Sequence, residues 1–185
     1  MIKVGLVGED PNDTLSIKNL LEKRYKGRVQ FKALVKGIKG HQLDSPKIKN
    51  ALKVEFKDQK CKFIVYIRDL DAFKSQIARF QAKIKWFKDL DASVNSNGIL
   101  LLNIQELEAL IFGDITTFNK IHGIEYKFKK NPMLVKHPKK TLKSLTPKFH
   151  ESHCPEIFKQ LNVDEVEKNC SCFKEFITDF DAKLN

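Results

Sequence analysis

Three acidic residues, Glu9, Asp69 and Asp71, have the types and spacing that could support chemistry, and they stand in a strongly basic chain. The 185 residues include 34 Lys or Arg and 23 Asp or Glu, for a formal net charge of +11. Adjacent carboxylates repel and raise each other's pKa unless a cation lies between them. Mg²⁺ and Mn²⁺ take oxygen ligands, typically one or two carboxylates with water and substrate phosphate. These acids therefore predict a Mg²⁺ or Mn²⁺ site that acts on a phosphate.

Simpler structural roles are open for the same acids. Asp71 could cap the helix that follows it, and Asp69 could pair with Arg68. Asp10 and Asp13 are expected to serve the start of the first helix, because Asp is favoured at the N-cap and in the first turn. Glu9 alone would be an ordinary loop residue, so the prediction depends on the combination.

The apolar pattern predicts the elements that must position these acids. Continuous apolar runs predict buried strands, and apolar residues three and four apart predict helices. The expected strands are 2–7, 28–35, 62–67 and 99–104. The expected helices are 11–25, 45–56, 73–87, 105–112, 155–161 and 172–184. The inner face of the helix at 73–87 should consist of Phe73, Ile77, Phe80, Ile84 and Phe87.

The alternation of strands and helices predicts an α/β fold. We expect a compact, Rossmann-like parallel sheet with helices on both faces, because its strands are apolar on both sides. Residues 1–114 should form the α/β core, and residues 115–185 Lys-rich loops and C-terminal helices packed on it. Ligands of such sheets bind beyond the carboxyl ends of the strands, where Glu9, Asp69, Asp71 and a later pair, Glu106 and Glu108, would stand.

The motif formed by Gly8-Glu9 and Asp69-Leu70-Asp71 resembles that of the TOPRIM domain of bacterial primases, type IA topoisomerases and overcoming-lysogenization-defect (OLD) family nucleases. More closely, nearly the full chain is similar to a family of small bacterial TOPRIM-like proteins. Three further segments carry this resemblance: 105–114, Pro138-Lys139 and 172–176.

The resemblance implies a TOPRIM-like nuclease that hydrolyses nucleic-acid phosphodiesters with Mg²⁺ or Mn²⁺. Glu9, Asp69 and Asp71 would be catalytic and hold metal, Glu9 could also act as acid or base, and Glu106 would support a second ion. Glu106 is preferred to Glu108 because residues two apart on a helix do not face one site. Some relatives are encoded beside AAA-type ATPases, which implies a partner ATPase and a role in phage defence.

Two other function classes are weighed against the nuclease. One is a non-catalytic TOPRIM-like subunit that binds or regulates partners in such a complex. The other is a phospho-acceptor receiver domain, which the charge of +11 and the doubled Asp-x-Asp disfavour. The sequence contains neither a P-loop nor a dinucleotide-binding glycine motif, which disfavours the common nucleotide-binding classes.

Basic residues in the later part of the chain predict a nucleic-acid contact. Lys136, Lys139 and Lys140 could bind the phosphate backbone, although a solvated charged loop would have the same composition.

The cysteines and the apolar runs indicate the compartment. Four cysteines are too few and too unevenly spaced for a disulfide framework, which predicts a reducing cytoplasm. The longest apolar runs fall far short of the roughly 20 residues of a membrane span, and the N-terminus does not resemble a signal peptide. A zinc site is left open for His150, His153, Cys154, Cys170 and Cys172.

Overall fold

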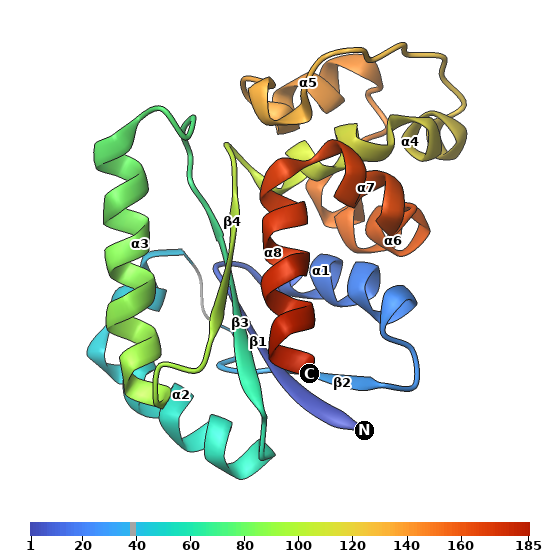
Figure 1. Cartoon of the computed structure of the whole chain (residues 1–185). Helices are drawn as coiled ribbons and strands as arrows, with labels where there is room; N and C mark the ends of the chain where they lie inside the picture. The colour runs from blue at the N-terminus through green and yellow to red at the C-terminus, as the bar shows by residue number, and fades with distance from the viewer. Residues whose placement is uncertain (38–39) are drawn as a thin grey trace.

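A four-stranded parallel β-sheet forms the centre of the molecule, as a computed structural model of residues 1–37 and 40–185 shows (Figure 1). The strands lie in the order β2-β1-β3-β4. Their bounds are β1 Ile2–Gly8, β2 Val29–Ala33, β3 Phe63–Asp69 and β4 Ile99–Asn103. All three neighbouring pairs are parallel, so the predicted α/β class is confirmed.

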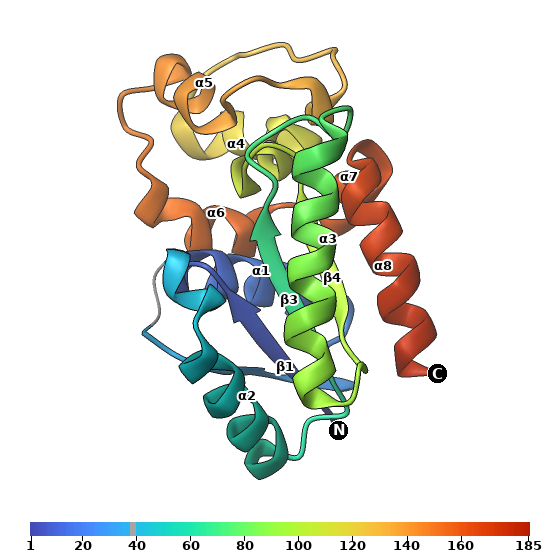
Figure 2. The same ribbon diagram turned by 90° about the vertical axis from the view of Figure 1, so that its left-hand side faces the viewer.

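Helices cover both faces of this sheet. The α-helices are α1 Pro11–Arg24, α2 Pro46–Gln59, α3 Ile77–Asp91, α4 Ile115–His122, α5 Pro138–Leu145, α6 Cys154–Gln160, α7 Val163–Asn169 and α8 Ser171–Leu184. Short 3₁₀ helices are η1 Gly40–Asp44, η2 Ala92–Val94, η3 Leu107–Asp114, η4 Pro132–Leu134 and η5 Glu151–His153. Figures 1 and 2 show α2 and α3 on one face and α1 and α8 on the other. Within the described residues, no helix is long and apolar enough to cross a membrane.

The strands feed two hydrophobic cores because their side chains alternate between the faces. Val4 and Leu6 of β1 join the core beneath α1 and α8, whereas Val7 joins the core beneath α2. In β3, Val65 and Tyr66 divide in the same way. Burial on both faces explains why these strands appear in the sequence as unbroken apolar runs.

Helix α3 differs from the sequence prediction. Phe73 precedes the helix, and Ile77 is 62% exposed, so the predicted inner face is only partly buried. The fully buried residues of α3 are Leu90 and Asp91, at its C-terminal end. The apolar spacing fitted a helix, but it could not show that only one end of that helix packs tightly.

Residues 115–150 contain two helices, α4 and α5, where the sequence predicted Lys-rich loops. Each is anchored by a buried apolar residue, Phe118 in α4 and Leu142 in α5. Pro138 opens α5, and its fixed φ suits the first helical position. Because lysines surround these anchors, the sequence of each short helix does not show a clear apolar period.

The C-terminal helices share a core with the sheet. Phe180 of α8 is fully buried, and its ring lies 4.6 Å from that of Tyr25 and 5.3 Å from that of Phe63. Phe173 and Phe176 of the same helix are also buried. Residues 115–185 are therefore built into the same hydrophobic core as β1 and β3.

Candidate functional site

The predicted acids lie at one edge of the sheet, beyond the carboxyl ends of β1 and β3. From β1 the chain passes to β2 on one side and later to β3 on the other, which makes the β1/β3 edge the topological switch point. Ligand crevices in open α/β sheets form there. Glu9 follows β1, and Asp69 is the last residue of β3, whose Ile67 pairs with Gly8.

Asp69 is half-buried and is held from the neighbouring strand. It pairs in register with Asn103 of β4, whose side-chain Nδ2 donates a hydrogen bond of 3.0 Å to Asp69 Oδ1. Burial raises the pKa of Asp69 well above its ordinary value, and the nearby Asp13 carboxylate raises it further. The Asn103 hydrogen bond acts in the opposite direction but does not offset these effects.

Asp13 and Glu108 complete a group that we call the inner carboxylates: Asp13, Asp69 and Glu108. Burial raises the pKa of Asp13 to about 7. Among the charged neighbours of Asp13, Glu108 contributes most to this rise. Glu108 is only 5% exposed, and burial raises its pKa while Lys139, 3.8 Å away, lowers it. Burial therefore raises the pKa of all three carboxylates, and the charge of Glu108 disfavours the ionised forms of Asp13 and Asp69.

From the sequence, Asp13 was expected to serve the start of α1, and Glu106 was preferred to Glu108 at the site. Asp10 does cap α1, since its side chain accepts from the Asn12 backbone N–H at 2.7 Å, but Asp13 faces the inner site. Glu106 instead accepts from the Lys139 backbone N–H at 2.9 Å. The helix expected to begin at residue 105 is a 3₁₀ helix that begins at Leu107. With this start, Glu108 is the glutamate that faces inward. The sequence feature that could have indicated the role of Asp13 is its position in the first helical turn after the end of a strand.

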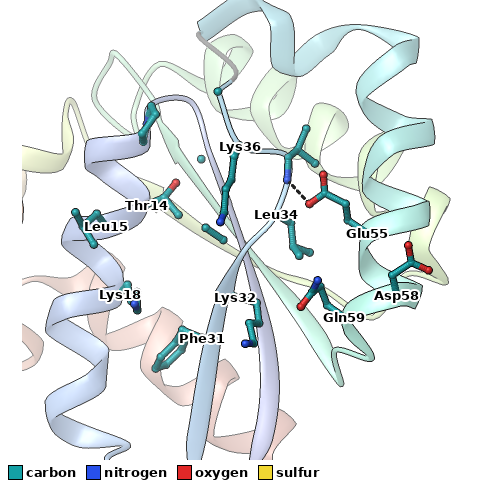
Figure 3. Close-up of a pocket in the computed structure, with 15 residues that line it drawn as sticks. Thr14, Leu15, Lys18, Phe31, Lys32, Leu34, Lys36, Glu55, Asp58 and Gln59 are labelled. Carbon is teal, nitrogen blue, oxygen red and sulfur yellow. Dashed lines mark hydrogen bonds between the residues drawn. The ribbon is translucent and has the colours of Figure 1, made fainter.

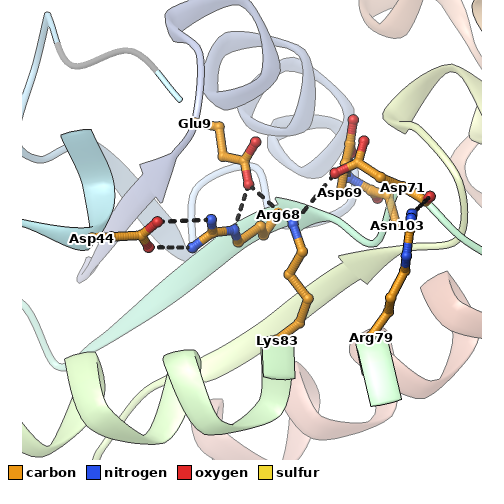
Figure 4. Close-up of polar contacts among 8 residues, drawn as sticks. All are labelled: Glu9, Asp44, Arg68, Asp69, Asp71, Arg79, Lys83 and Asn103. Atoms are coloured by element: carbon orange, nitrogen blue, oxygen red, sulfur yellow. Dashed lines mark hydrogen bonds and ion pairs between the residues drawn. The ribbon is translucent and has the colours of Figure 1, made fainter. Parts of the chain in front are cut away.

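Glu9 and Asp71, which we call the outer carboxylates, have basic partners instead of facing an open site (Figure 4). Lys83 Nζ lies 3.7 Å from Glu9 Oε1 and 3.4 Å from Asp71 Oδ2. Arg68 Nε lies 2.5 Å from the same Glu9 oxygen. These contacts neutralise much of the outer negative charge.

Asp71 does not continue the extended backbone that the Asp-x-Asp prediction assumed. Its φ is 55°, in the left-handed region, and its carbonyl oxygen accepts from Arg79 Nη1 at 2.9 Å. The side chain is 61% exposed. It also does not cap α3, which begins six residues later at Ile77. The turn at Asp71 therefore directs its carboxylate to Lys83, while Asp69 belongs to the inner group.

Arg68 is fixed by contacts of its own. Its Nη1 lies 2.8 Å from Asp44 Oδ1, and its guanidinium carbon lies 4.1 Å from the centre of the Trp86 ring. Arg68 thus pairs with Glu9 and Asp44, not with Asp69.

The inner site has oxygen donors suited to a hard divalent cation. Among the described residues, no three His, Cys, Asp or Glu side chains are already arranged around a common point for a metal. Mg²⁺ commonly needs only one or two protein carboxylates, because water and substrate phosphate complete its shell. Asn103 is 1% exposed, and its Oδ1 atom has no hydrogen-bond partner. Asp69, Asp13 and this amide oxygen fit such an ion by their chemistry.

The cysteines and histidines considered for zinc do not form a zinc site within the described residues, although the His150 and His153 rings lie 6.0 Å apart. Cys154 Sγ is 4.0 Å from Glu108 Oε1, and Cys172 Sγ is 3.1 Å from Met133 Sδ. Cys170 packs beside Gly113, where a Cβ would meet its sulfur at 2.7 Å. Burial raises the pKa of the Cys172 thiol to about 11, which disfavours the thiolate that zinc needs.

The three lysines predicted to contact nucleic acid divide into two environments. Lys136 and Lys140 are exposed on either side of the α5 start. Lys139 is half-buried, and its Nζ lies 2.7 Å from Glu151 and 3.8 Å from Glu108. Burial opposes its charge, but these glutamates raise its pKa overall. Lys139 is thus a counter-charge of the inner carboxylates.

A hollow of 740 Å³ lies beside edge strand β2 (Figure 3). Its lining includes Lys18, Lys32 and Leu34, and Glu55 accepts a hydrogen bond from the Val35 backbone N–H at 2.8 Å. None of the inner or outer carboxylates lines it, so we place the chemistry at the β1/β3 edge.

A family described as Domain of unknown function (DUF4276) matches residues 9–181. No curated protein and no solved structure matches the chain. The matched range contains all five inner and outer carboxylates, from Glu9 to Glu108.

Proposed function

The chain belongs to the DUF4276 family, and we propose that it is a cytoplasmic, TOPRIM-like hydrolase of nucleic-acid phosphodiesters that depends on Mg²⁺ or Mn²⁺. The observation that carries the proposal is the cluster of Asp13, Asp69 and Glu108, in which burial and repulsion from nearby carboxylates raise all three pKa values. A divalent cation would relieve this repulsion, which makes the inner carboxylates a favourable binding site.

The bound ion would supply a polarised phosphate and an activated water. Asp69 and Asp13 would hold the ion through their carboxylate oxygens. Asn103 would keep the Asp69 carboxylate oriented through its 3.0 Å hydrogen bond. Lys139, between Glu108 and Glu151, would limit the net negative charge that an approaching phosphate meets.

The exposed Lys136 and Lys140 support nucleic acid as the substrate class. They flank the α5 segment whose Lys139 reaches the inner carboxylates, so a bound phosphate backbone could extend from these lysines toward the site. The charge of +11 favours a polyanionic substrate.

A cleavage assay tests the proposed activity. With Mn²⁺, the wild type should cleave single- or double-stranded DNA or RNA, and Asp69→Asn and Asp13→Asn should each reduce the rate at least about 100-fold. Asp89→Asn is the matched control, because this exposed carboxylate pairs with Lys85 on the outside of α3. Full cleavage by an Asp69→Asn, Asp13→Asn double variant would overturn the assignment. The wild type is assayed alone and with its partner ATPase, should one be encoded beside it.

A second function is favoured by the outer carboxylates. Glu9 and Asp71 are already paired with Lys83 and Arg68, as acids with a purely structural role would be. On this account the chain is a non-catalytic, TOPRIM-like regulatory subunit. It predicts that the Asp69→Asn, Asp13→Asn variant retains full biological function.

A further inference from the structure

Lys83 occupies the position that a cation would take between the outer carboxylates. Its ammonium nitrogen lies within 4 Å of both Glu9 and Asp71, which follow the ends of β1 and β3 at the same edge of the sheet (Figure 4). The Lys83 side chain is only 19% exposed although α3 is largely exposed around it. Lys85, two residues along, is exposed and pairs with Asp89 one turn away on the same helix.

The two basic groups on Glu9 differ in how firmly they are held. The Arg68 guanidinium is fixed by Asp44 and by the face of Trp86, in addition to Glu9. Within the described part of the chain, the ion pairs of the Lys83 ammonium are with two side-chain carboxylates, Glu9 and Asp71, and Asp71 is largely exposed. A flexible four-carbon stem lets a lysine exchange one anionic partner for another without moving the backbone.

We propose that Lys83 is an intramolecular counter-ion that closes the Glu9–Asp71 position to a divalent cation until an anionic substrate draws its ammonium away. This inference rests on the proposed function, since it concerns ion binding at the same edge. With Lys83 in this role, the site has two positions. The inner carboxylates are available for one ion, and the outer carboxylates form a second position that Lys83 fills. Phosphate oxygens would then bind the released ammonium, and the second ion would enter only with substrate present.

The physical argument is electrostatic. A positive charge about 4 Å from a carboxylate lowers the affinity of that carboxylate for another cation, both by neutralising it and by repelling the newcomer. Removing the Lys83 charge while keeping its bulk would leave Glu9 paired with Arg68. Among the residues that the structure describes, no other ion pair would then neutralise the Asp71 carboxylate. The outer position would then gain cation affinity, because the neighbouring acids would lack their internal counter-charge.

The test is a Mn²⁺ titration followed by the electron paramagnetic resonance signal of the free ion, on wild type, Lys83→Gln and Lys85→Gln. Thermal melts first establish that all three proteins fold. We expect Lys83→Gln to bind one more Mn²⁺ than wild type, or to bind Mn²⁺ at least about tenfold more tightly. Lys85→Gln should match wild type, because its charge lies on the exposed side of α3.

Asp69→Asn is included so that the two proposals fail differently. If wild type and Lys83→Gln bind Mn²⁺ with equal stoichiometry and affinity, and Asp69→Asn abolishes that binding, the counter-ion role is overturned and the proposed metal site stands. If neither wild type nor Lys83→Gln binds Mn²⁺, both are overturned. If Lys83→Gln and Lys85→Gln strengthen binding equally, the effect is one of net charge and the counter-ion role is again overturned.

Discussion

Asp69 and Asn103 face each other across neighbouring strands, and the 3.0 Å hydrogen bond between them uses only the amide nitrogen of Asn103. The amide oxygen is buried and accepts no hydrogen bond from the residues that the structure describes. A buried polar atom without a partner costs free energy. Such an atom beside Asp69, a carboxylate whose pKa is raised, is expected where a ligand binds.

Asn103→Asp tests this relationship by changing charge with little change in shape. Without metal, a further carboxylate beside Asp69 should lower the free energy of unfolding by about 1–3 kcal/mol, because it adds repulsion in a buried place. With millimolar Mg²⁺, the variant should gain more thermal stability than wild type gains. Asn95→Asp, in an exposed turn, is the control and should respond to Mg²⁺ as wild type does. An equal Mg²⁺ response of Asn103→Asp and wild type would contradict a cation at this position.

The raised pKa of Asp13, about 7, predicts a pH dependence of stability. The unfolded chain releases this proton near pH 4, whereas the folded protein retains it until about pH 7. The folded state therefore binds more protons between these values, and its stability from this group falls as pH rises, by at most about 1.4 kcal/mol per pH unit.

Urea unfolding between pH 4 and 8 measures this slope. Asp13→Asn should show a shallower decline than wild type across that window, because it has no proton to release. Added Mg²⁺ should flatten the wild-type decline, since the ion favours the ionised carboxylate. Identical pH profiles of wild type and Asp13→Asn would show that Asp13 titrates normally.

Charge reversal at Lys136 and Lys140 should weaken nucleic-acid binding and reduce its dependence on salt. Each phosphate contact contributes about 0.9 to the slope of log K against log salt for duplex DNA. The double variant should therefore lose up to about 2 units of slope, measured by fluorescence anisotropy. Lys159→Glu with Lys168→Glu, exposed positions on α6 and α7, gives the same net charge change. Equal losses in both double variants would indicate a purely compositional effect.

The shared core predicts that the C-terminal helices and the sheet unfold together. Phe180→Ala removes a fully buried ring that packs on Tyr25 and Phe63, and should cost about 3–5 kcal/mol in a single transition. Ile77→Ala, on the exposed part of α3, should change stability by less than about 0.5 kcal/mol. Two separate transitions in chemical denaturation would contradict one core.

Much of the sheet could be predicted from the sequence, because its strands are buried on both faces and their apolar runs need no tertiary information. β3 is the clearest case: residues 62–67 predicted it, and the structure extends it only to Asp69. Helices α4 and α5 could not be found in this way, since each has one buried anchor among lysines.

The edge of the sheet that carries the site followed from topology, but the orientation of its side chains did not. Sequence spacing cannot show that Asp71 adopts a positive φ and turns to Lys83, or that Asp13 faces inward while Asp10 caps α1. The choice between Glu106 and Glu108 depended on whether residues 105–107 begin an α-helix, which local propensity leaves undecided.

Isothermal titration calorimetry of Mg²⁺ into the purified protein tests the central claim, that the inner carboxylates bind a divalent cation, most directly. Wild type and Asp89→Asn should bind Mg²⁺ with the same affinity, and Asp69→Asn should lose that binding while remaining folded. Absence of binding to wild type, or undiminished binding to Asp69→Asn, would contradict the claim.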